Sequence, residues 1–137
     1  MPEANYLAVL VAGLASFVVG GVWYSPLLFV KPWMAELGIT RESAMEAKPN
    51  MTLLYGTALI TSLLAAYAMA LLLVTPQHHS LAIGVRRGLA AGIFWVATAF
   101  GSSYAFEGKS LRHWAINAGF YVVQFAVMGA ILGVMNN

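Results

Sequence analysis

Four long apolar segments run along this chain, and polar connections separate them. Each segment is almost free of charged side chains. Because an α-helix rises about 1.5 Å per residue, each is long enough to cross a hydrocarbon core of about 30 Å. The pattern therefore predicts an all-α fold, a four-transmembrane-helix antiparallel bundle forming one integral membrane domain over residues 1–137. The expected helices cover residues 6–28, 51–74, 82–106 and 111–135.

The first apolar segment has a rival interpretation as a cleavable signal peptide. A signal peptide needs a positively charged region before its apolar run, and residues 1–5 contain neither Lys nor Arg. We therefore interpret the segment as a retained transmembrane helix. Pro26 removes one backbone hydrogen bond, which predicts a kink or the end of the helix close to Ser25.

Aromatic residues, a proline and a lysine follow one another where the first segment ends. Trp and Tyr favour the headgroup level of a membrane because each combines an apolar ring with a polar atom, and a lysine there can place its ammonium in water. We interpret this stretch as a membrane-interface anchor, made of Trp23, Tyr24, Pro26, Lys31 and Trp33.

Residues 29–50 are the longest polar stretch and hold half of the charged side chains. Pro32 is placed to start a short helix that Gly38 would end, and Thr40 is placed to cap a second one running through Ala47. Apolar residues alternate with these charges. The favoured prediction is an amphipathic segment between helices 1 and 2, lying on the membrane surface; a plain solvated loop is the alternative.

Composition agrees with a membrane environment. Hydrophobic residues make up 61% of the chain and charged residues 9%, whereas a soluble domain carries about a quarter charged residues. The mean hydropathy is +0.77. The net charge of +2 is too small and dispersed for nucleic-acid binding, and the lipid bilayer is the first expected partner. The absence of cysteine excludes disulfides and thiolate metal sites.

The distribution of positive charge predicts an orientation. Four spans place both termini and the second connection on one side, where the cations are Arg86 and Arg87. The opposite side holds more of them, and cytoplasmic loops carry an excess of Lys and Arg. We therefore expect the termini on the non-cytoplasmic side. The cations of the other side are Lys31, Arg41, Lys48, Lys109 and Arg112.

Small residues recur at four-residue spacing in several segments. Lipid provides no hydrophobic force between helices, so close packing depends on small residues that let backbones approach. We expect a tightly packed bundle in which at least one such ladder joins copies of the chain into a homo-oligomer. The ladder residues include Ser16 and Gly20 in the first helix and Gly84, Gly88 and Gly92 in the third.

Four polar residues share one face of the last helix, and we call them the polar seam. Polar groups at membrane depth are costly unless they face a partner, a cavity or water. One interpretation is a hydrophilic path for an ion or small solute, and the other is hydrogen bonding between helices. The spacing i, i+4, i+8 and i+11 defines the seam as His113, Asn117, Tyr121 and Gln124.

An interfacial charge cluster, Glu107, Lys109 and Arg112, precedes the seam. It is placed either to bind an anionic lipid or substrate, or to anchor the helix hairpin as solvated charges. Glu107 and His113 are two metal-ligand types without a third, so we predict no metal site. The chain has no Asp, which excludes a Ser-His-Asp triad. We expect no cofactor, no catalytic residue and no enzymatic activity.

Two stretches carry a family resemblance. The first is Gly20-Gly21-Val22-Trp23-Tyr24-Ser25-Pro26-Leu27-Leu28-Phe29, with Lys31, Trp33 and Leu37-Gly38-Ile39-Thr40; the second is Phe106, Lys109-Ser110, Asn117-Ala118-Gly119-Phe120-Tyr121 and Gly129-Ala130-Ile131-Leu132-Gly133. Over nearly its whole length the sequence resembles the domain-of-unknown-function 1761 family of small bacterial membrane proteins. The resemblance implies a four-span protein of the bacterial inner membrane. It implies no established activity, so no functional residue is carried over.

Two classes of function remain open. The favoured one is a structural or accessory membrane protein that forms homo-oligomers and binds a partner or lipid. The alternative is a small transporter or channel for an ion or small solute that uses the polar seam.

Overall fold

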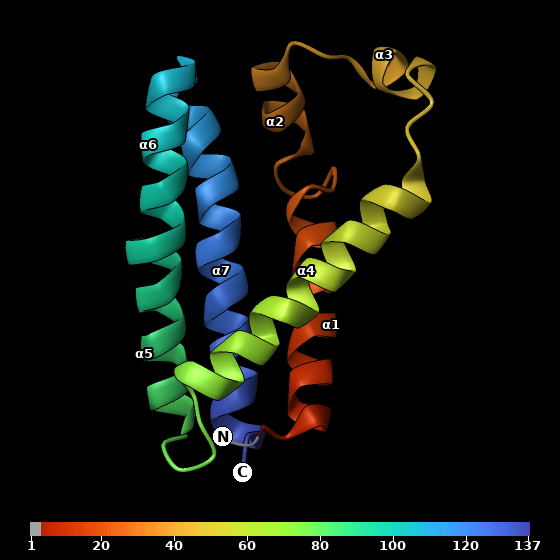
Figure 1. The fold of residues 1–137 in the computed structure, drawn as a ribbon. Helices are drawn as coiled ribbons and strands as arrows, with labels where there is room; N and C mark the ends of the chain where they lie inside the picture. Colours follow the sequence, from red (N-terminus) through yellow and green to blue (C-terminus); the bar gives the residue numbers. More distant parts are fainter. Residues whose placement is uncertain (1–3) are drawn as a thin grey trace.

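The computed structural model describes residues 4–137. This part of the chain is helical, without strands, and four of its helical segments are long and apolar enough to cross a membrane. They run alternately up and down (Figure 1). The predicted all-α fold with four membrane-length helices is confirmed.

Helix α1 covers Tyr6–Trp23. It begins there because the side chain of Asn5 accepts hydrogen bonds from the backbone N–H groups of Leu7 and Ala8. It ends before Pro26, in a turn where the Ser25 hydroxyl donates to the carbonyl of Val22. The end close to Ser25 was predicted, whereas the extension to residue 28 was wrong because the backbone turns before the proline.

Two short helices follow, α2 over Val30–Leu37 and α3 over Arg41–Glu46. Gly38 ends α2 in the left-handed conformation, with a φ of 69°, which glycine adopts without steric cost. The Thr40 hydroxyl caps α3 by accepting from the backbone N–H of Ser43. The predicted segment between the first two spans is confirmed as a pair of short helices, and α2 packs beside the last long helix.

Helix α4 covers Met51–Leu72 and crosses α1 diagonally (Figure 1). Its buried residues, Ser62, Ala66, Met69 and Ala70, all lie in its C-terminal half, and in its N-terminal half Tyr55 packs edge-on against Phe17 of α1. Most side chains of residues 51–61 are exposed. The bundle is therefore open along the N-terminal half of α4, and the helix ends at residue 72 rather than at residue 74.

The third span combines α5, Leu81–Ala91, a π-helical turn η1, Gly92–Ala97, and α6, Thr98–Glu107. Gly108 then reverses the chain with a φ of 70°, and the Ser110 side chain caps the next helix by accepting from the backbone N–H of His113. That helix, α7, covers Leu111–Met135. It packs against α1 on one side and α5 on the other, so it is the centre of the fold.

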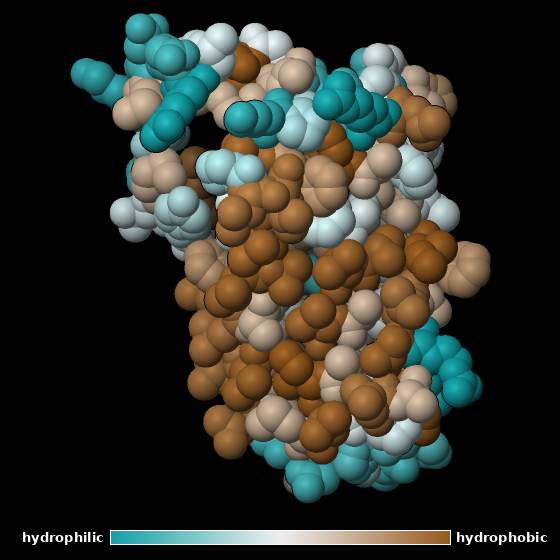
Figure 2. Space-filling model, turned by 180° about the vertical axis from the view of Figure 1, so that it is seen from behind, coloured by the Kyte–Doolittle hydropathy of each residue, from teal (hydrophilic) through white to brown (hydrophobic). Residues whose placement is uncertain are grey.

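The surface has the banding expected of a membrane protein. On the face seen in Figure 2, apolar residues cover the middle, and hydrophilic residues gather at both ends. The start of α1 and the end of α7 lie at one end of the bundle, together with the α4–α5 connection (Figure 1). A cluster of buried apolar residues forms where α1, α4 and α7 meet, at Ala8, Val9, Ala12, Ala66, Met69, Ala70, Val74, Met128 and Leu132.

Candidate functional site

Glycines bring α5 and α7 into backbone contact. A Cβ atom at Gly84 would collide with the carbonyl oxygen of Gly129, and one at Gly88 would collide with that of Phe125. A Cβ at Gly92 would lie 2.8 Å from the Cα of Val122. The predicted ladder of the third helix therefore packs within the chain. This contact fixes α7 against α5.

The ladder residues of α1 also face the interior of the same chain. Ser16 is fully buried, and its hydroxyl donates to the carbonyl of Ala12 at 2.8 Å. A Cβ at Gly20 would lie 3.2 Å from the ring of Phe120 on α7. Both residues have intramolecular neighbours, so a contact between copies of the chain would need a different surface.

The π-helical turn changes how the third span meets α7. Below the turn, in the view of Figure 1, α5 packs by glycine contacts. At the upper end of the turn the Trp114 indole N–H of α7 donates to the carbonyl of Ala97, the last residue of η1, at 2.9 Å, and a Cβ at Gly101 of α6 would lie 3.3 Å from the same indole nitrogen. The hydroxyl of Thr98, the first residue of α6, donates back to the carbonyl of Phe94 in the turn at 2.6 Å. The wider turn thus separates two kinds of helix contact. An apolar run does not disclose such a turn, so sequence reasoning missed it.

Asn117 is the centre of the polar seam. Its side-chain oxygen accepts a hydrogen bond from the Tyr24 hydroxyl at 2.7 Å, and its side-chain nitrogen donates to the Tyr104 hydroxyl oxygen at 2.8 Å. One amide therefore joins the end of α1, α6 and α7. Both of its polar atoms are engaged within the protein.

The other seam residues also contact neighbouring helices. Gln124 is buried, and its side-chain nitrogen donates to the Ser62 hydroxyl of α4 at 3.2 Å. Tyr121 stacks on Phe100 with ring centroids 5.2 Å apart. The His113 ring is buried and meets the Tyr104 ring edge-on, also at 5.2 Å. Asn117 and Gln124 thus form hydrogen bonds with neighbouring helices, whereas Tyr121 and His113 contact aromatic rings of α6.

The aromatic residues of the predicted interface anchor point toward α7. The Trp23 indole N–H donates to the carbonyl of Ile116 at 2.9 Å, and Trp33 packs edge-on against Tyr24. Lys31 and Pro26 are exposed. The three rings therefore help to hold the end of α1 on α7, a role that the aromatic pattern did not distinguish from anchoring at the headgroups.

The interfacial charge cluster divides into two contacts. Lys109 pairs with Glu107 at 3.0 Å, while Glu36 of α2 accepts from the Ser110 hydroxyl at 2.7 Å and lies 3.8 Å from Arg112. Glu36 therefore docks α2 at the N-terminus of α7, where a carboxylate is favourable.

The Glu107 pair also affects the titration of Lys109. Its hydrogen bond raises the pKa of Lys109 above the ordinary lysine value. The ammonium form of Lys109 is therefore favoured. The stability that the ion pair adds to the fold is lost as the pH rises through that raised pKa. Because the pair lies at the exposed surface, we expect the contribution to be small.

A polar clamp at the opposite end of the bundle was missed by sequence reasoning. Asn136 is fully buried: its side-chain oxygen accepts from the backbone N–H of Asn5 at 2.9 Å, and its side-chain nitrogen donates to the carbonyls of Ala70 and Val74. Three helices, α1, α4 and α7, are thereby tied together. Two consecutive asparagines after a helix are typical of a solvated tail. Only the position of Asn136 next to the last apolar run could have indicated that it ties helices together.

Among residues 4–137 no three metal-ligating side chains lie close enough together to hold an ion. Residues 7–133 match a family described as "Protein of unknown function (DUF1761)". The chain belongs to this family. No curated protein and no solved structure matches it. This DUF1761 member is a protein with four membrane-length helices, and its family description assigns no activity, so a functional assignment depends on the contacts described above.

Proposed function

We propose that the chain is a non-catalytic, structural or accessory protein of the bacterial inner membrane that acts as a homo-oligomer. One observation carries the proposal: the amide groups of the polar seam are engaged in hydrogen bonds between helices of the same chain. Asn117 and Gln124 bond to three other helical regions. Groups engaged in this way stabilise a scaffold and are not available to coordinate a passing solute.

The N-terminal half of α4 is the surface that we assign to a second copy. Leu53, Leu54 and Tyr55 are more than half exposed. A Cβ at Gly56 would have no atom within 4 Å, unlike one at the core glycines. A glycine inside a helix costs about 0.5–1 kcal/mol relative to alanine. Its presence without a neighbour in the chain favours close approach by another helix from outside.

The oligomeric state in lipid nanodiscs tests this assignment. We expect the wild-type protein to be a dimer or larger, and Gly56→Leu to shift it toward the monomer without loss of helicity. Gly21→Leu is the matched control, because Gly21 also has open space around it but lies at the end of α1. A wild-type monomer at every protein concentration, or equal assembly in all three proteins, would refute the proposed oligomer.

Flux measurements test the alternative of a transporter or channel. We expect proteoliposomes containing the wild-type protein to pass ions and small solutes no faster than empty liposomes. Flux that Asn117→Leu abolishes would contradict the scaffold function and support a path along the polar seam.

We further propose that both termini face away from the cytoplasm. Arg86 and Arg87 are the cations toward the end that holds the termini, and the other end carries more. A reporter that is fluorescent only in the cytoplasm should stay dark when fused after Asn137. A fluorescent fusion would reverse the orientation.

A further inference from the structure

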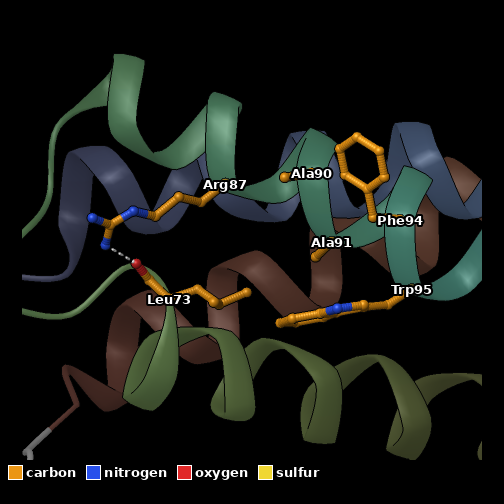
Figure 3. A pocket seen from close by; sticks show the side chains of 6 residues that line it. All are labelled: Leu73, Arg87, Ala90, Ala91, Phe94 and Trp95. Carbon is orange, nitrogen blue, oxygen red and sulfur yellow. Dashed lines mark hydrogen bonds between the residues drawn. The ribbon is translucent and has the colours of Figure 1, made fainter.

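A hollow of about 200 Å³ lies on the flank of the bundle, between the C-terminal end of α4 and the α5–η1 segment (Figure 3). Five of its six lining residues are apolar: Leu73, Ala90, Ala91, Phe94 and Trp95. The sixth is Arg87. The hollow is thus an apolar groove with one cation at its end.

The shape of the groove follows from the spacing of its residues. Arg87, Ala90, Ala91, Phe94 and Trp95 recur at i, i+3, i+4, i+7 and i+8, which is one face of a helix. The groove is open at the two alanines because their side chains are small, and Trp95 reaches across toward α4 (Figure 3). From Arg87 to Trp95 the helix advances about 12 Å. The groove therefore runs from the cation along the apolar flank of the span.

The guanidinium of Arg87 is held in place by the protein. One of its terminal nitrogens donates to the carbonyl of Leu73, the residue that directly follows α4. A guanidinium has five N–H donors, so four remain for another acceptor. The side chain is exposed, and its orientation is fixed by this bond. Arg87 is therefore presented as a preoriented donor at the mouth of the groove.

The charge around this end of the bundle is uncompensated in the described part of the chain. Neither Arg86 nor Arg87 forms an ion pair with any of residues 4–137. The four acidic residues of that part belong to α2, α3 and the end of α6, at the other end of the bundle (Figure 1). In Figure 2 a hydrophilic patch interrupts the apolar belt on the flank where α5 lies. This arrangement matches an anionic amphiphile: the cation suits a negatively charged head group, and the apolar groove suits a hydrocarbon chain.

We propose that this groove binds one anionic phospholipid, with its phosphate on Arg87 and an acyl chain along Ala90, Ala91 and Trp95. Charge-assisted hydrogen bonds from an arginine fork to phosphate are strong and geometrically specific. The apolar lining accepts the acyl chain, which a soluble anion lacks. This site goes beyond the proposed oligomer and does not depend on it, because the oligomer contact is assigned to the N-terminal half of α4.

Native mass spectrometry of the detergent-solubilised protein tests the site. The probes are phosphatidylglycerol and phosphatidylcholine with identical acyl chains. The wild-type protein should retain one phosphatidylglycerol in preference to phosphatidylcholine. Arg87→Gln should lower phosphatidylglycerol binding about tenfold, the usual worth of one charge-assisted hydrogen bond. Arg86→Gln is the matched control, because it removes the same charge from the adjacent residue outside the groove, and it should change binding less than about twofold.

Two further arms separate the proposal from simpler explanations. Ala90→Phe fills the groove while leaving Arg87 and its bond to Leu73 in place, so it should lower the binding of both lipids. Glycerol phosphate, which has the anion but no acyl chain, should fail to displace the bound lipid. Any of four results would overturn the site. Two concern selectivity: the wild-type protein binds the two lipids equally, or Arg86→Gln and Arg87→Gln lose binding equally. The other two are that Ala90→Phe binds lipid as the wild-type protein does, or that glycerol phosphate displaces the bound lipid.

Discussion

The two halves of the contact between the third span and α7 are built differently. Below the π-helical turn, α5 meets α7 through glycines, and the backbones touch. Above it, the Trp114 indole of α7 donates to the carbonyl of Ala97 at the end of η1 and lies beside Gly101 of α6, and the Tyr104 hydroxyl of α6 accepts from Asn117. Membrane helices lack a hydrophobic drive to associate, so packing and hydrogen bonds must hold them. The comparison indicates that this protein uses the first means at one end and the second at the other.

This difference predicts which contact is less tolerant of change. A backbone atom cannot move aside as a flexible side chain can, so added volume is least tolerated at the glycine contacts. A lost hydrogen bond, in contrast, removes one interaction and leaves the helices in place.

The largest effect is expected from Gly88→Leu. A Cβ at this position would already collide with the carbonyl of Phe125, so a leucine must separate α5 from α7. We expect a destabilisation of about 3 kcal/mol or more, measured by unfolding in a denaturing detergent and followed by circular dichroism. Gly21→Leu, where a Cβ meets nothing within 4 Å, is the control. Equal stability of the two variants would show that backbone contact is not what holds α5.

An intermediate effect is expected from Asn136→Leu. The substitution removes the acceptor of the Asn5 N–H and the donor to Ala70 and Val74. Leaving such buried groups unpaired should cost about 2 kcal/mol in the same unfolding measurement. Asn137→Leu alters an exposed neighbour whose contact with the Asn5 side chain is long, at 3.3 Å, and should change stability by less than about 0.5 kcal/mol. The clamp is disproved if the two substitutions are equivalent.

The smallest effect is expected from Asn117→Leu. Hydrogen bonds between membrane helices average about 0.6 kcal/mol each, so losing two should cost about 1 kcal/mol. Tyr24→Phe and Tyr104→Phe each remove one of these bonds and should cost about half as much. A double-mutant cycle between Asn117 and Tyr24 measures the coupling directly. No coupling would mean that the upper half of the contact is held by ring packing alone.

Much of the fold was predictable because it follows from local chemistry. Long uncharged segments require helices in lipid, and Pro26, Gly38, Thr40 and Ser110 each act on the backbone next to them. The shared face of the polar seam followed from helix periodicity alone. These features depend on residues close together in the sequence.

The remaining features depend on the partner helix, which the sequence does not identify. Trp23 and Tyr24 suit a membrane interface and a helix contact equally well, and only the position of α7 decides between them. The glycine ladders were predicted, and at least one was expected to join copies of the chain, whereas Gly84, Gly88 and Gly92 have their neighbours in α7 of the same chain. The burial of Asn136 depends on three helix ends meeting. The lean of α4 likewise follows from where its packed residues meet α1.

Cysteine accessibility tests most directly the claim that the polar seam is a dry helix contact. The chain contains no cysteine, so a single introduced thiol is the only site for a water-soluble thiol reagent. In liposomes, Gln124→Cys should react as slowly as Leu64→Cys, whose parent side chain is 63% exposed on the apolar flank of α4, and far more slowly than Arg112→Cys at the end of the bundle. Reaction of Gln124→Cys at the rate of Arg112→Cys would mean that water reaches the seam, and would contradict the account.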